Sequence, residues 1–195
     1  MNIPHQINFI LILALLCFLP PSVLAQKLPS KVDIKTKDVS AGDLTKEQCL
    51  QRIRGIHLTK DLRGAKIDEV DISGANLAFA DLSEASLKKS ILKNAKLNRA
   101  NLTKANLENA ILYQADLSGA KLISANLQNA NLTKADLKNA LMVGANLSKA
   151  VLIDADLSAA NLTGAILEGA QTNGAVFSGT IMPDGRINPI ATKDK

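Results

Sequence analysis

The chain has 195 residues, enough for one domain or one elongated array of repeats. Hydrophobic residues make up 47% of it, yet only 3% are aromatic and none is Trp. A core without large aromatic side chains must be built from Leu and Ala, which favours a small repeated unit over a globular enzyme. Charged residues make up 21%, close to the share in folded proteins, which argues against wholesale disorder.

The formal net charge of +5 is concentrated near the start of the mature chain. Residues 26–60 contain eight basic and four acidic residues, whereas residues 61–182 contain twelve of each. The body of the chain is therefore neutral overall. A neutral body gives little support to binding of nucleic acid through its phosphates, so we expect no nucleic-acid partner.

The first 25 residues are typical of a secretory signal peptide. The apolar run over residues 7–19 is thirteen residues long, shorter than the roughly 20 that a transmembrane helix needs. Pro20 and Pro21 follow it, and the small residue Ala25 suits cleavage. We therefore predict export to the periplasm or an equivalent lumenal compartment, with no stable membrane insertion after cleavage. Because no Lys or Arg precedes the apolar run, an uncleaved anchor remains the alternative.

Residues 26–59 are predicted to form a leader followed by a capping helix. The leader is rich in Lys and lacks apolar periodicity. A short helix is expected over residues 43–54, because Asp43 can cap its start and Gly55 can end it. The open end of a repeat array exposes apolar core, so this helix would cover the array that follows. The covering residues would be Leu44, Cys49, Leu50 and Ile53.

A period of five residues dominates the rest of the chain. From residue 62 to residue 182 every fifth residue is apolar in a series of 25, with Thr172 as the one exception. Ala precedes these central residues by two positions, without a break from Ala95 to Ala175. On an α-helix, five residues advance by about 500°, so no apolar stripe would form. In a flat strand, an odd spacing would send successive central residues to opposite faces.

The period fits a unit made of a short extended piece and a turn. Ala and the central residue are two apart, so both would point inward along an extended segment. The other three positions hold mainly polar residues suited to turns and solvent, and would point outward. Repeated turns in one sense would close the chain into stacked coils.

These units resemble those of a known family. Segments such as Ala75-Asn76-Leu77-Ala78-Phe79 and Ala100-Asn101-Leu102-Thr103-Lys104 are similar to the A(D/N)Lxx motif of pentapeptide-repeat proteins. The resemblance covers residues 60–182 and implies an all-β solenoid. The expected fold is a right-handed quadrilateral β-helix of about six coils, four units per coil, behind a short N-terminal capping α-helix.

The two ends of the array depart from the motif. Lys60, Val70 and Ser90 occupy the Ala position, and Thr172 is a polar central residue, so we expect the first and last coils to be less regular. The turn-forming sequence Met182-Pro183-Asp184-Gly185 is predicted to stop the repeat. Residues 183–195 would then form a C-terminal tail.

Few residues suit catalysis or metal binding. The mature chain offers Cys49 and His57 as candidate nucleophile and base, both near the predicted cap, and has no metal-spaced Cys/His cluster or phosphate loop. With 20 residues per coil, Asp116, Asp136 and Asp156 would stack in one column that could hold a divalent cation. The simpler interpretation is that this position prefers Asp or Asn for local hydrogen bonds. We predict no enzyme, no cofactor and no metal site.

Apolar residues at outward positions are the candidate contact site. Positions 20 apart would stack, which aligns some of these residues on one face, and aligned apolar residues suggest contact. The predicted contact residues are Ile91, Ile111, Tyr113, Val151 and Ile153. A smaller group on the opposite face comprises Ile123, Leu141 and Val143. The alternative is local irregularity that tucks these side chains in.

The predicted function is that of a non-catalytic, exported scaffold or protein–protein interaction module. Its partner would be another envelope protein or a second copy of the chain. The family resemblance implies one alternative, since cytoplasmic pentapeptide-repeat proteins mimic DNA and protect topoisomerases. A DNA mimic needs a strongly negative surface, so the neutral body and the signal peptide disfavour this alternative.

Overall fold

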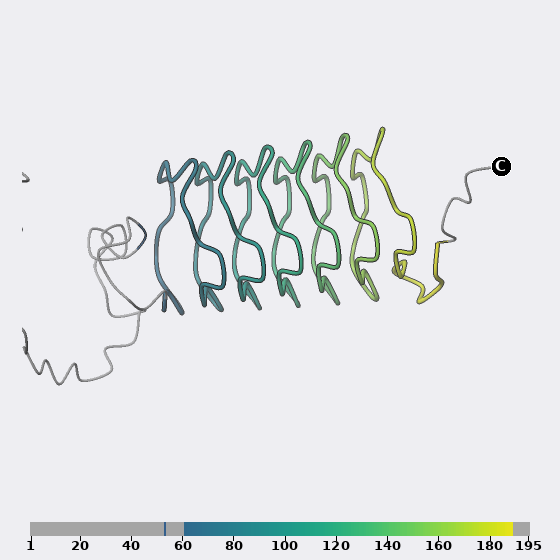
Figure 1. Cartoon of the computed structure of the whole chain (residues 1–195), viewed down its shortest axis with the longest axis horizontal. Coiled ribbons are helices and arrows are strands. Elements are labelled where there is room, and N and C mark those ends of the chain that lie inside the picture. Colours follow the sequence, from purple (N-terminus) through teal and green to yellow (C-terminus); the bar gives the residue numbers. More distant parts are fainter. Residues whose placement is uncertain (1–52, 54–60, 189–195) are drawn as a thin grey trace, which may run out of the picture. The chain divides into compact units, whose positions relative to one another are not determined.

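The computed structural model of the protein describes Ile53 and residues 61–188. Residues 61–188 form a series of stacked coils (Figure 1). The predicted signal peptide, the leader, Cys49, His57 and the end of the tail lie outside the described residues. Of the predicted capping helix, Ile53 alone is described. It is helical, and its side chain is buried, with 8% exposed.

Each coil takes 20 residues. Isolated parallel β-bridges join residues 20 apart, beginning with Asp61 and Asp81 and ending with Asn161 and Ile181. The bridges are single-residue contacts at every fifth position, because a turn interrupts the chain between them. Six steps of 20 residues lead from Asp61 to Ile181. The predicted coil of four units, and the predicted six coils, are therefore confirmed.

Each unit contains a β-turn that starts at its central residue. For example, the N–H of Ala100 donates to the carbonyl of Leu97 at 3.0 Å. The third residue of this turn, Arg99, has a φ of 57°. Among the described residues, sixteen other than Gly have this left-handed conformation, which costs about 1–2 kcal/mol per residue. A bond between coils offsets that cost, because the N–H of Arg99 donates to the carbonyl of Ser118 in the next coil.

The core is a continuous column of central residues and alanines. Every central residue from Leu82 to Leu162 is fully buried, and the alanines two positions before them are at most 1% exposed. The predicted inward positions are therefore confirmed. The last coil is looser, as expected, because Thr172 is exposed and Phe177 is only partly buried.

The first coil is regular in its stacking but not in the turn from Ile67 to Val70, and Ser90 of the second coil explains the difference. The coil keeps its bridges from Asp61 onward, and Ser90 is fully buried at an Ala position. Its hydroxyl donates to the carbonyl of Ile67 at 2.6 Å and accepts from the N–H of Val70 at 3.3 Å. The hydroxyl thus stands between two groups that bond directly in most other units. A polar residue fits here because all of its polar atoms are satisfied.

The array ends in a hairpin. The N–H of Met182 donates to the carbonyl of Arg186 at 2.7 Å, and Gly185 donates back to Met182 at 2.9 Å. Ile181 then pairs with Ile187 in an antiparallel bridge. The predicted turn at residues 182–185 therefore does stop the parallel stacking.

Candidate protein-contact site

The four units of a coil define four sides of the solenoid. The residue before each central residue lies on a side and points outward, and residues 20 apart form a column along that side. Side A carries positions 61, 81, 101, 121, 141, 161 and 181, and side B carries 66, 86, 106, 126, 146 and 166. Side C carries 71, 91, 111, 131, 151 and 171, and side D carries 76, 96, 116, 136, 156 and 176.

Asp or Asn at these outward positions completes the backbone hydrogen bonding of the turn. On side C, Oδ1 of Asn131 accepts a hydrogen bond from the N–H of Thr133 at 3.0 Å. On side D, Asp116 accepts from Ser118 in the same way, also at 3.0 Å. This N–H follows the central residue and takes no part in the bonds between coils. The motif therefore has a structural reason, because a short side-chain acceptor bonds the one N–H of each unit that has no backbone acceptor.

The acidic column on side D serves this structural role. Asp116, Asp136 and Asp156 each accept the N–H of their own turn at 2.9–3.0 Å. Lys138 lies between two of them, with Nζ 3.5 Å from Asp136 and 3.1 Å from Asp156. Its hydrogen bond to Asp156 and the two carboxylate charges raise the pKa of Lys138. In the described residues, no group of three or more His, Cys, Asp or Glu is placed to hold a metal ion.

The pKa of Asp156 is shifted in the complementary direction. Partial burial opposes ionisation of this carboxyl group. Hydrogen bonds from Ser158 and Lys138, together with the charge of Lys138, outweigh that effect and lower its pKa. Contacts within the chain therefore favour the ionised form of Asp156 on side D.

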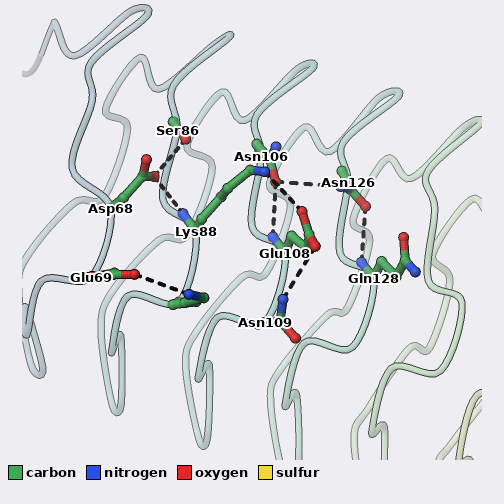
Figure 2. A network of polar contacts seen from close by, with 10 residues as sticks. Asp68, Glu69, Ser86, Lys88, Asn106, Glu108, Asn109, Asn126 and Gln128 are labelled. Atoms are coloured by element: carbon green, nitrogen blue, oxygen red, sulfur yellow. Dashed lines mark hydrogen bonds and ion pairs between the residues drawn. The ribbon is translucent and has the colours of Figure 1, made fainter.

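Side B and the turns beside it carry a polar network (Figure 2). Asp68 accepts hydrogen bonds from the hydroxyl of Ser86 at 2.6 Å and from the N–H of Lys88 at 2.8 Å. The Nζ of Lys88 lies 3.1 Å from Glu108 in the next coil. The network continues through the stacked amides of Asn106 and Asn126. Most polar groups on this side are thus engaged with each other.

Side C departs from the Asp/Asn pattern at four of its six outward positions, of which three are aliphatic and one is Gln171. Ile91, Ile111 and Val151 have no acceptor, so they cannot bond to the N–H of the following turn as Asn131 does. These residues give up a local hydrogen bond and place aliphatic groups on the surface instead. The hydrogen bonding of the coil itself does not require an aliphatic residue at these positions.

The structure brings the predicted contact residues to one side but does not make them continuous. Ile91 and Ile111 are bridge partners in adjacent coils, whereas Asn131 separates Ile111 from Val151. Tyr113 and Ile153 lie in the turns that leave side C, two coils apart. All five predicted residues are half-buried. A shallow hollow of about 430 Å³ is lined by Lys93, Asn94, Ile111, Tyr113 and Asn131.

The opposite side exposes its apolar residues more fully. On side A, Leu141 is 39% exposed, and Val143 in the turn that follows is 36% exposed. Sequence reasoning ranked this group second, because the stacking pattern carries no information on exposure. It also missed Phe79, which is 66% exposed and lies under the guanidinium of Arg99, 5.8 Å from the ring centroid. The 20-residue spacing of Phe79 and Arg99 is the signal that could have found this pair.

The coil geometry agrees with a comparison to known families. Residues 61–99, 100–139, 130–169 and 140–179 match the family described as pentapeptide repeats, in eight copies of the family's motif. The chain belongs to the pentapeptide repeat family. Known structures of the family are right-handed quadrilateral β-helices, and its members are generally structural or interaction proteins rather than enzymes.

Solved structures of other pentapeptide repeat proteins are similar to this chain. Rfr23 from the cyanobacterium Cyanothece 51142 is 29% identical with a TM-score of 0.51, and the match covers 69% of this chain and 100% of Rfr23. A protein of the Arabidopsis thaliana thylakoid lumen is 32% identical with a TM-score of 0.35, over 49% of this chain and 63% of its own. QnrB1, a plasmid-mediated fluoroquinolone resistance protein, is 23% identical with a TM-score of 0.37, over 61% and 66%. No curated protein matches the chain.

Membership in the pentapeptide repeat family makes the departures on side C more informative. The family motif places Asp or Asn where this chain has Ile91, Ile111 and Val151, and the structure shows what that residue normally bonds to.

Within the described part of the chain, no helix has the length and apolarity needed to span a bilayer.

Proposed function

We propose that this chain is a non-catalytic, exported interaction module that binds protein through side C. The carrying observation is the replacement of the turn-bonding Asp or Asn by Ile91, Ile111 and Val151. Tyr113 and Ile153 extend the same surface from the adjacent turns. Each aliphatic residue forgoes a hydrogen bond worth about 0.5–1.5 kcal/mol, and burial of three such residues of one column under a partner would compensate for that loss.

The size of the surface favours a weak or conditional complex. Six coils at about 4.8 Å each give a side roughly 30 Å long, and the five residues of one side, at about 3.3 Å each, span at most about 16 Å, so one side covers at most roughly 500 Å². A standard interface buries about 800 Å² per partner. One side of the coil therefore falls short of what an obligate complex needs, and association entropy would consume most of the apolar gain.

Export supports a partner in the periplasm or an equivalent lumen. The motivation is the apolar run over residues 7–19 and the small residue Ala25 after it. N-terminal sequencing of the native protein should begin near Gln26. Native protein that retains Met1 and stays in the cytoplasm would refute this part of the proposal.

The topoisomerase-protecting alternative finds little support in the surface charges. A DNA mimic needs extended acidic faces, whereas residues 61–182 carry twelve acidic and twelve basic residues. The acidic column on side D is bridged by Lys138, and Glu108 beside side B is paired with Lys88.

The side C proposal is tested by the double variant Ile111→Asn/Val151→Asn. Each Asn copies Asn131 in the same column and can accept the N–H of its own turn. The gained bond offsets the lost aliphatic contact, so stability should stay within about 1 kcal/mol of the wild type. Association, measured by light scattering and by pull-down from the envelope fraction with the mature protein as bait, should be lost.

A matched control is available on side B. Ile166→Asn makes the same chemical change at an outward position that is 50% exposed, below Asn146 in its column. This variant should keep every association of the wild type. If the side C variant also keeps all of them, while its melting temperature is unchanged, the proposed contact surface is wrong.

A further inference from the structure

We propose that the occupant of side C is side A of a second copy of this chain, so that copies stack side by side in parallel. The inference rests on the proposed function of side C and names its partner. It follows from four observations: the opposition of the two sides, the height of their apolar residues, the order of charges at one edge, and residue sizes at the other.

Sides A and C are opposite sides of a four-sided coil, because their units are two apart in every coil. A shift of one copy by one coil width, perpendicular to the stacking axis, therefore sets its side A against side C of its neighbour. No rotation is needed, and residues at equal heights meet. Such a contact is heterologous, since each copy keeps one free side A or side C, and the array can add further copies.

The apolar residues of the two sides lie at matching heights. Leu141 lies on side A, and Val143 lies in the turn that follows it. Half a coil later, Val151 lies on side C, and Ile153 lies in the turn that follows it. Ten residues are half a coil, or about 2.4 Å along the axis. The translated copies would therefore bring the exposed pair on side A against the C-terminal part of the side C surface.

The charges at one edge of the contact are complementary. At the turn leaving side A, Glu84 and Lys104 form an ion pair between coils at 3.7 Å, with both side chains more than 60% exposed. At the turn entering side C, Lys88 and Glu108 form a pair at 3.1 Å in the reverse order. Translation makes these two turns neighbours, only a quarter of a coil apart in height. Glu84 would then face Lys88, and Lys104 would face Glu108.

The other edge fits by size but not by charge. The turns entering side A contain the small residues Gly119 and Ala159, and these would face the large residues Tyr113 and Ile153 in the turns leaving side C. The same edge also brings like charges together, namely Lys93 with Arg99 and Lys134 with Lys138. One favourable edge and one opposing edge agree with a weak, salt-dependent association.

Two charge exchanges test the arrangement. The first variant, Glu84→Lys/Lys104→Glu, reverses the edge of side A, and the second, Lys88→Glu/Glu108→Lys, reverses the edge of side C. Each keeps the net charge and an ion pair within its own chain. Each alone would set like charges against each other, so self-association of the full mature chain at low salt should weaken at least about tenfold.

Mixing the two variants in equal amounts should restore self-association. In the mixture, the reversed side A of one variant meets the reversed side C of the other, and the remaining contacts are those of the wild type. A contact between two copies of side C, or between side C and an unrelated protein, predicts no such rescue. Leu141→Asn, which changes side A alone, should weaken self-association of the wild type as much as the side C variant does.

The outcomes separate this inference from the proposed function. If the wild type is monomeric by sedimentation, or if the exchanges and Leu141→Asn have no effect, the side-by-side arrangement is wrong. Side C remains the contact surface in that case if Ile111→Asn/Val151→Asn still abolishes capture of another protein. If the side C variant loses nothing, both proposals are wrong. Thermal melts of all variants verify that each remains folded.

Discussion

A charge placed on the coil axis should unfold the array, while the same charge one residue later should not. Leu127 is fully buried at a central position, and Gln128 is the next residue, in the turn. Leu127→Ala should lower the free energy of unfolding by about 2–5 kcal/mol, because a cavity forms in a core made of Leu and Ala. Leu127→Lys loses the same packing and also buries an unpaired ammonium group, which adds several kcal/mol.

The sum for Leu127→Lys is comparable to the entire stability of a typical domain, about 5–15 kcal/mol. We therefore expect unfolding of the middle coils, seen as loss of β-type circular dichroism and as a shift of the urea midpoint. Gln128→Lys should change the free energy of unfolding by less than about 0.5 kcal/mol. Raising the pH should partly restore Leu127→Lys, because a buried Lys has a lowered pKa and the neutral amine is tolerated. Equal tolerance of the two Lys variants would refute the inward and outward assignment.

Two further predictions concern the turns and side D. Ala159→Gly should raise the free energy of unfolding by about 1 kcal/mol, because Ala159 has a φ of 57°. Gly74→Ala should lower it by a similar amount, because Gly74 has a φ of 68° and an added Cβ would meet open space. Urea titration measures both changes. The lowered pKa of Asp156 means that its carboxylate stabilises the fold above the ordinary Asp pKa, and that this contribution is lost as the pH falls through the lowered value. Lys138→Met should therefore reduce the melting temperature at neutral pH, with the difference from the wild type shrinking in acid; a difference that grows in acid would contradict this account.

The fold could be predicted from the sequence because a strict period leaves few geometries. The five-residue spacing from Leu62 to Met182 excludes both helix and flat strand, and every central residue in the middle coils is buried as expected. Ser90 could not be predicted, because its hydroxyl is satisfied by groups in the preceding coil that only the structure brings near it. Ser can therefore occupy an Ala position without interrupting the stacking of the coils.

The candidate site could be predicted only in part. Stacking at multiples of 20 placed Ile91, Ile111 and Val151 on one side, as the bridges show. The exposed fraction of each side chain depends on the neighbouring turns, which is why Leu141 on the opposite side is more exposed than any of them. The cost of the aliphatic residues also needed the structure, since it depends on knowing which N–H an Asp or Asn would accept.

The 20-residue register has a consequence for how such a chain can change its length. Each coil bonds only to the coils before and after it, so an insertion of 20 residues would lengthen the stack and leave every side as it was. An insertion of five residues would also keep the buried column intact, because Leu and Ala would still alternate inward. It would, however, turn every later coil by a quarter, and Val151 would move from side C to side D while Ile111 stayed in place. In this architecture the buried column repeats every five residues, whereas residues on one side repeat every 20. A family of stable proteins can therefore differ in which residues meet on one side without any difference in fold.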